Sequence, residues 1–305
     1  MEITMDRRCW ITVFTVIIWL FGSISVAAEP LVAYTVNYPL QYFAQRIAGD
    51  HAEVVLPVPH DVDPAFWKPD AAAIGDIQRA DLILLNGAGY AKWSSRVSLP
   101  RRKLVDTSAG FSDRYIRSQG GITHSHGRDG EHSHTGTAST TWLDFSLAAE
   151  QAGAVHDALS RLMPQHGDLF TENYLALKRD LLDLDARLET LFSQVAGIPM
   201  IASHPVYQYL ARRYSLNLKS VMWEPDAMPA ETEWQGLAEM RKAHPASWMI
   251  WEGAPADDIS RRLHQLGLQP VVYKPCANRP ATGDFMSNMK LNLENIAKLT
   301  DQTDQ

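Results

Sequence analysis

The sequence is short of cysteine and of positive charge, and both shortages exclude classes of protein. It contains two cysteines, Cys9 and Cys276, and no close-spaced pair of the kind that builds a structural zinc module. The formal net charge is −7 at pH 7. A nucleic-acid-binding protein would need a basic face. We therefore expect neither a disulfide framework nor a nucleic-acid partner.

Long apolar runs are missing from all but the first residues. Two arginines precede an apolar run from Trp10 to Phe21, and small residues follow up to Ala28. The run is shorter than the roughly 20 residues that a membrane span requires. A basic start, an apolar centre and a small-residue end are typical of a secretory signal peptide. We predict that residues 1–28 are cleaved after Ala28 and that the protein is periplasmic; an uncleaved N-terminal anchor is the alternative.

Strands alternate with helices in two separate stretches of the chain, which predicts an α/β fold with mostly parallel sheets. In the first stretch we expect strands at 31–36, 53–58, 81–85 and 104–106, with helices at 38–48 and 71–80. In the second we expect strands at 200–202, 218–222, 248–251 and 270–273, with helices at 205–214, 259–266 and 285–299.

A long helix connects the two stretches. After an expected helix at 147–162, apolar residues recur at spacings of three and four from Phe170 to Leu191, which predicts an amphipathic helix of about 28 residues. The fold class is therefore α/β, with two Rossmann-like lobes joined by a long connecting helix. The predicted division is an N-terminal lobe at 29–145, the two helices at 146–196 and a C-terminal lobe at 197–305.

A histidine-rich segment lies at residues 123–134, near the end of the predicted N-terminal lobe. It is rich in glycine and serine, has no apolar periodicity, and contains His124, His126, His132 and His134. Because such a composition cannot bury a core, we predict a mobile loop. Neutral imidazole is a favoured ligand of zinc. The segment therefore indicates metal binding, with a solvated polar loop as the alternative.

Two further histidines directly follow predicted strands. His60 follows the strand at 53–58, and His204 follows the strand at 200–202. Open α/β sheets bind ligands at the carboxyl ends of their strands. We therefore predict a metal site in a cleft between the lobes, where imidazoles from both would hold a tetrahedral ion.

Four segments also carry a resemblance to a known family. They are Pro-His-Asp-Val-Asp-Pro at 59–64, Ala80–Tyr90, Ser203–Tyr214 and Met289–Leu293. In this order, the chain resembles the periplasmic solute-binding proteins of zinc and manganese ABC importers (ZnuA/TroA-like) over nearly all of its length after residue 28. The resemblance implies two α/β lobes bridged by one long helix, with His60 and His204 as metal ligands from opposite lobes.

The sequence departs from the family at two ligand positions. Thr140 stands where the family has a histidine, and we predict that His134, six residues upstream, takes its place. After the last strand the family often has an aspartate, whereas residues 274–278 contain no acid. Glu252, Cys276 and water are the candidates for the fourth ligand.

These residues predict a metal receptor that is not an enzyme. Metal ligands His60, His134 and His204 would bind a divalent ion, zinc before manganese, and a monomeric protein would deliver it to an ABC transporter permease. A manganese or iron receptor is the alternative of the same class. An exported zinc hydrolase is disfavoured because the chain has no His-Glu-x-x-His motif. A metallochaperone without a transporter stays open.

Overall fold

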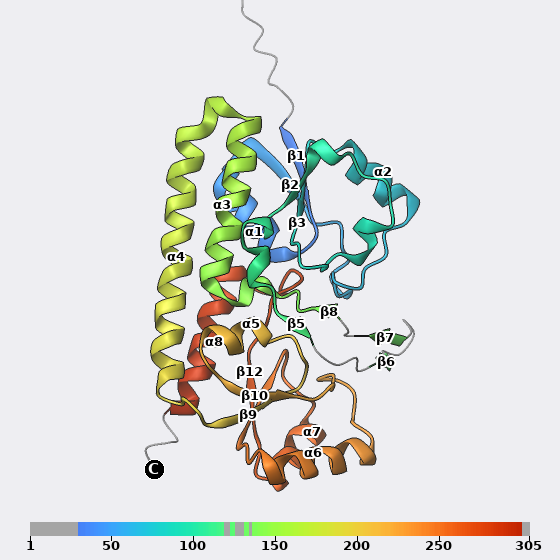
Figure 1. The fold of residues 1–305 in the computed structure, drawn as a ribbon, viewed down its shortest axis with the longest axis vertical. Coiled ribbons are helices and arrows are strands. Elements are labelled where there is room, and N and C mark those ends of the chain that lie inside the picture. Colours follow the sequence, from blue (N-terminus) through green and yellow to red (C-terminus); the bar gives the residue numbers. More distant parts are fainter. Residues whose placement is uncertain (1–29, 119–122, 126–130, 134–135, 301–305) are drawn as a thin grey trace, which may run out of the picture.

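The computed structural model describes residues 30–118, 123–125, 131–133 and 136–300 (Figure 1). The predicted signal peptide and His134 lie outside these residues. No helix among the described residues is long and apolar enough to cross a membrane.

The first sheet has four parallel strands in the order β2-β1-β3-β4. Its strands are β1 (Leu31–Thr35), β2 (Ala52–Val55), β3 (Leu82–Leu85) and β4 (Leu104–Asp106), and its helices are α1 (Tyr38–Ala48) and α2 (Ala71–Arg79). Helix α1 begins where predicted, because the Asn37 side chain accepts the Leu40 backbone N–H at 3.2 Å and Pro39 suits the first turn. Strand β2 ends three residues earlier than predicted.

The second sheet repeats this topology, with four parallel strands in the order β10-β9-β11-β12. Its strands are β9 (Pro199–Ala202), β10 (Asn217–Ser220), β11 (Trp248–Trp251) and β12 (Gln269–Val272). Its helices are α5 (Gln208–Arg213), α6 (Glu231–Ala243), α7 (Asp257–Gln265) and α8 (Phe285–Thr300). The predicted α/β fold with two lobes is therefore confirmed.

Helices α3 (Phe145–Leu162) and α4 (Gly167–Ser193) pack against each other, and α4 runs alongside both lobes (Figure 1). The leucine stripe that predicted α4 is buried at Leu177, Leu181, Leu184 and Leu188. Helix α8 packs on both α4 and α1, and Phe285 makes an edge contact with Phe43 at 5.6 Å between ring centroids. The C-terminal part of the chain therefore returns to the N-terminal lobe.

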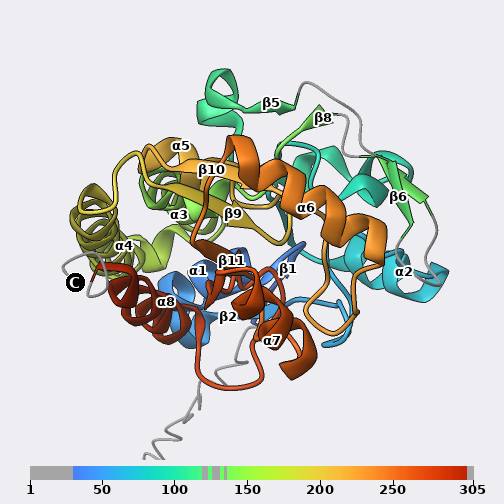
Figure 2. The same cartoon turned by 90° about the horizontal axis from the view of Figure 1, so that it is seen from below.

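Three sequence predictions differ from the structure. Helix α6 was not predicted, because its two buried residues, Trp234 and Leu237, give only a weak apolar pattern. In Figure 1 it lies at the end of the molecule remote from the first sheet, and Figure 2 views the molecule from that end. Helix α5 begins at Gln208 rather than at residue 205, because the Val206 N–H bonds the His204 carbonyl in a turn, at 3.0 Å.

The third difference lies in the described residues of the histidine-rich segment, 123–125 and 131–133, which form two short strands that were not predicted. Strand β6 (Thr123–Ser125) pairs with β7 (Glu131–Ser133), which places His124 opposite His132. Strand β5 (Arg117–Ser118) pairs with β8 (Gly136–Thr137). Antiparallel pairing needs no apolar run, and composition alone therefore missed it. The remaining short elements are 3₁₀ turns at Gly49–His51, Lys92–Ser95, Arg101–Lys103, Ala109–Arg114, Thr141–Leu143 and Pro164–His166.

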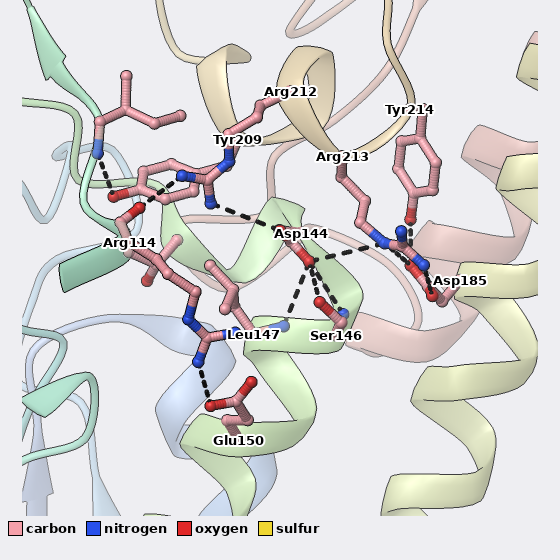
Figure 3. Close-up of polar contacts among 12 residues, drawn as sticks. Arg114, Asp144, Ser146, Leu147, Glu150, Asp185, Tyr209, Arg212, Arg213 and Tyr214 are labelled. Atoms are coloured by element: carbon pink, nitrogen blue, oxygen red, sulfur yellow. Dashed lines mark hydrogen bonds and ion pairs between the residues drawn. The ribbon is translucent and has the colours of Figure 1, made fainter. Parts of the chain in front are cut away.

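A polar network fastens α5 to the connecting helices (Figure 3). Arg213 donates two hydrogen bonds to Asp185 of α4, at 2.9 and 2.5 Å, and Tyr214 donates a third to the same carboxylate at 2.9 Å. Asp144 accepts the backbone N–H groups of Ser146 and Leu147 at the start of α3, at 3.1 and 3.3 Å.

Asp144 also joins the two lobes, because its carboxylate lies near two arginines of α5. The distances are 3.7 Å to Arg212 and 4.0 Å to Arg213. Asp144 therefore combines a helix cap with an inter-lobe charge contact.

Asp144→Ala should lower the free energy of unfolding by about 1–2 kcal/mol, because the α3 cap is lost. Asp144→Ser, which keeps a capping oxygen but no charge, should retain most of that stability, since long ion pairs contribute less than about 1 kcal/mol. Urea unfolding of both variants measures the difference. Equal losses in the two variants would show that the charge contact, and not the cap, dominates.

Candidate metal site

The two lobes offer equivalent positions for a ligand. In the first sheet β1 and β3 are neighbours, and in the second β9 and β11 are neighbours. The strand order reverses between the two members of each pair. Open α/β sheets bind ligands at the carboxyl ends of the strands at such a reversal. In the second sheet these ends carry His204 after β9 and Glu252 after β11. Glu224 follows the neighbouring strand, β10.

Backbone hydrogen bonds hold these three residues in place. The Ser203 N–H bonds the Ile250 carbonyl at 2.8 Å, and the Trp223 N–H bonds the Ser203 carbonyl at 2.7 Å. Ser203 precedes His204, Ile250 lies two residues before Glu252, and Trp223 precedes Glu224. The backbone that carries these three side chains is therefore held in place by hydrogen bonds that continue the pattern of the sheet.

His204 lies between the two glutamates. Its Nδ1 is 3.4 Å from Oε1 of Glu224 and 3.4 Å from Oε1 of Glu252. The His204 residue is 7 % exposed, whereas the side chains of Glu224 and Glu252 are 42 % and 33 % exposed. A buried imidazole thus faces two carboxylates at the mouth of the second sheet.

Negative charge accumulates around Glu252. Burial, together with the charges of Asp63 and Glu224, raises the pKa of Glu252 to about 8. Asp63 belongs to the N-terminal lobe, so carboxylates face each other across the two lobes. A divalent cation would neutralise this concentration of charge.

His60 is placed by the C-terminal part of the chain. The Asn278 amide donates to the carbonyls of Pro59 and Val62, at 2.6 and 2.8 Å, and thereby brackets the turn that carries His60. The His60 imidazole is exposed and makes no hydrogen bond or ion pair with the described residues. The turn is therefore fixed while its imidazole stays open to a ligand.

Asp63 stabilises the turn that follows His60. Its carboxylate accepts the Ala65 N–H at 2.9 Å. Its charge also reaches Glu252, and its position between the lobes could not be derived from local sequence.

Thr140 contributes a hydrogen bond at the position where the family has a ligand. Its hydroxyl donates to the carbonyl of Val206 at 2.5 Å, in the turn that follows His204. A buried amide network supports this contact, since Asn86 donates to the Ser139 carbonyl at 2.8 Å and accepts from Asn37 at 3.1 Å. Thr140 therefore links the two lobes directly, with its hydroxyl proton engaged.

The Cys276 thiol is a poor candidate for the fourth ligand. It is 8 % exposed and packs in the main hydrophobic core, and burial raises its pKa to about 12. Zinc binds the thiolate, and this thiol stays protonated. Among the described residues, no group of three or more His, Cys, Asp or Glu side chains is arranged to hold a metal ion on its own.

Sequence reasoning missed two residues of this region. Glu224 follows β10 as His204 follows β9, so the strand-end argument could have found it. The Tyr90 hydroxyl is buried without a hydrogen-bond partner, and burial together with the charges of Asp63 and Glu252 raises the Tyr90 pKa. Nothing in the local sequence distinguishes Tyr90 from an ordinary core tyrosine.

Metal-free protein should lose stability as pH rises between about 4.5 and 8. In that window the folded state keeps the Glu252 proton while the unfolded chain, with an ordinary glutamate pKa of 4.5, has released it. Glu252→Gln cannot titrate and should lack this part of the slope. Urea unfolding across the window measures both proteins. A constant difference between them at every pH would contradict the raised pKa.

Comparison with known proteins identifies the family of the chain. The family model described as zinc-uptake complex component A, periplasmic (ZnuA), matches residues 33–299. The zinc-binding lipoprotein AdcA of Streptococcus pneumoniae R6 is 25 % identical over 280 residues, which cover 88 % of this chain and 55 % of AdcA. The high-affinity zinc uptake system protein ZnuA of Bacillus subtilis 168 is 25 % identical over 255 residues, covering 79 % of this chain and 77 % of that protein.

Solved structures share the fold. The Zn(II)-bound ZnuA-like domain of Streptococcus pneumoniae AdcA superposes with a TM-score of 0.74 at 22 % identity, covering 90 % of this chain and all (100 %) of that domain. This chain thus spans about half of AdcA, and the shared part is the two-lobed fold. The resemblance predicted from the sequence motifs is confirmed. The chain belongs to the ZnuA family of periplasmic zinc-uptake components.

Proposed function

We propose that this protein is a periplasmic receptor that captures a divalent metal ion, zinc in the first place, and delivers it to an ABC transporter permease. The observation that carries the proposal is the buried His204, which faces carboxylates at the ligand-binding edge of one sheet while Asp63 faces them from the other lobe. A cation held there would join the lobes, and the permease would recognise that loaded state.

His60, His134 and His204 are the proposed imidazole ligands. His204 comes from a rigid strand end and His60 from a turn that Asn278 fixes. His134 lies outside the described residues, and its role rests on the sequence, where it is the histidine nearest to Thr140. The structure adds a reason to look beyond position 140, since the Thr140 hydroxyl proton is donated to a carbonyl.

The carboxylates near His204 support a second candidate metal within the same class of receptor. Carboxylates near the ion favour harder cations such as manganese or iron, so a second candidate within the same class is a receptor for these ions. The family description names an uptake component rather than an enzyme. We further propose that the receptor acts as a monomer and that residues 1–28 direct its export.

Zinc should stabilise the protein, because a ligand that binds only the folded state adds about 2.7 kcal/mol at a hundredfold excess over Kd. His204→Ala should abolish most of this gain and weaken zinc binding by more than the roughly 10- to 100-fold typical of lost supporting contacts. Calorimetric titration and thermal melts measure both effects.

The matched control is His264→Ala. His264 is an exposed histidine on α7 of the same lobe, and its removal should leave zinc affinity unchanged. A melting temperature of the wild-type protein that does not respond to zinc would contradict the receptor role. Equal losses in the two variants would show that the proposed site is misplaced.

A further inference from the structure

The spacing between His204 and Glu252 matches that of two ligands on one metal ion. Two donors bound to zinc at 2.0–2.1 Å in tetrahedral geometry lie about 3.3–3.4 Å apart, and Nδ1 of His204 lies 3.4 Å from Oε1 of Glu252. A charged N–H···O hydrogen bond would be shorter, near 2.7–2.9 Å.

The position of Glu252 in the sheet favours it over Glu224. Glu252 directly follows the central strand β11, which is hydrogen-bonded to the strand that leads to His204. Glu224 lies four residues beyond the end of β10, and its side chain is more exposed. Two negative charges act on Glu252: that of Asp63, in the opposite lobe, and that of Glu224, in the same lobe.

A buried tyrosine of the N-terminal lobe, Tyr90, is influenced by the charge of Glu252. Tyr90 is 3 % exposed, its hydroxyl has no hydrogen-bond partner among the described residues, and the charges of Asp63 and Glu252 both act on it. An unpartnered buried donor is costly. A carboxylate held in place by a metal ion would offer this hydroxyl an acceptor.

We propose that Glu252 is a direct metal ligand, paired with His204 at the crevice of the second sheet. This assignment rests on the proposed function. It supplies a ligand from the C-terminal lobe in a chain whose position 140 is occupied by a threonine engaged in a hydrogen bond. The pair does not complete a site, since no group of three or more His, Cys, Asp or Glu side chains among the described residues is arranged to hold a metal ion.

The assignment has a consequence for selectivity. An oxygen ligand tolerates harder cations better than a further imidazole would. The receptor should therefore bind Mn²⁺ measurably beside Zn²⁺, and Glu252→Gln should reduce Mn²⁺ affinity by a larger factor than Zn²⁺ affinity.

Cobalt(II) provides the test, because its visible absorption reports the ligands of the ion. The full chain after residue 28 is loaded with Co²⁺ alone, and Zn²⁺ affinity is measured by displacement. Glu252→Gln should change the Co²⁺ spectrum and weaken Zn²⁺ binding more than tenfold. Glu239→Gln, at an exposed glutamate of α6 in the same lobe, is the matched control and should leave the spectrum and the Zn²⁺ affinity unchanged. Glu224→Gln, at an equal distance from His204, compares the two glutamates and should change the spectrum less than Glu252→Gln does.

The outcomes separate this assignment from the proposed function. A Glu252→Gln spectrum identical to that of the wild type would overturn Glu252 as a ligand while leaving the receptor role intact. A spectral change in Glu224→Gln alone would overturn it in favour of Glu224. A wild-type protein that binds neither Co²⁺ nor Zn²⁺ would overturn both. Urea unfolding of each variant checks that it is folded, and glutamine is the replacement closest in shape to glutamate.

Discussion

The contact between the two lobes depends on one short segment, residues 275–279, which follows the last strand of the second sheet and forms hydrogen bonds with the N-terminal lobe. The segment accepts two hydrogen bonds, from Trp142 Nε1 at the Pro275 carbonyl (2.8 Å) and from the Tyr38 N–H at the Ala277 carbonyl (2.8 Å). It also donates four: the Asn278 amide to the carbonyls of Pro59 and Val62 (2.6 and 2.8 Å), and the Arg279 guanidinium to those of Leu56 and Val58 (2.7 and 2.8 Å). Cys276 has a φ of 55°, a left-handed backbone conformation that residues other than glycine adopt only when their surroundings impose it. The turn of His60 is thus positioned by the other end of the chain.

The two lobes use the same topology for different purposes. Where the first sheet places Asn37 and Asn86 at its crevice, two neutral amides satisfy each other at 3.1 Å and support the backbone of Ser139. Where the second sheet places His204 and Glu252, the groups are ionisable, and the charges of Asp63 and Glu224 act on Glu252. The amides of the first sheet therefore support the interface between the lobes, and the ionisable groups of the second are the ones that we propose for metal binding.

The sequence specified local structure well wherever a single periodicity dominated. The boundaries of α1, the length of α4 and the span of β11 follow from capping, the leucine stripe and an apolar run, respectively. Helix α6 was missed because its two buried residues give too weak a pattern.

The site was less predictable, because it depends on contacts between distant parts of the chain. His60 and His204 could be named from their place after strands, whereas the charge of Asp63 on Glu252 and the bond from Thr140 to Val206 arise only when the lobes meet. The predicted division at residues 145 and 196, and the ligand roles of His60, His134 and His204, stay predictions. The return of α8 to α1 shows that a boundary along the chain describes the packing incompletely.

The central claim is that one ion is held between the lobes at the crevice of the second sheet. Anomalous X-ray diffraction at the zinc edge, on crystals of the zinc-loaded protein, tests it most directly. We predict one strong peak within bonding distance of His204 and of at least one side chain from the N-terminal lobe. A zinc peak confined to the histidine-rich segment at 123–134, with none at His204, would contradict the account.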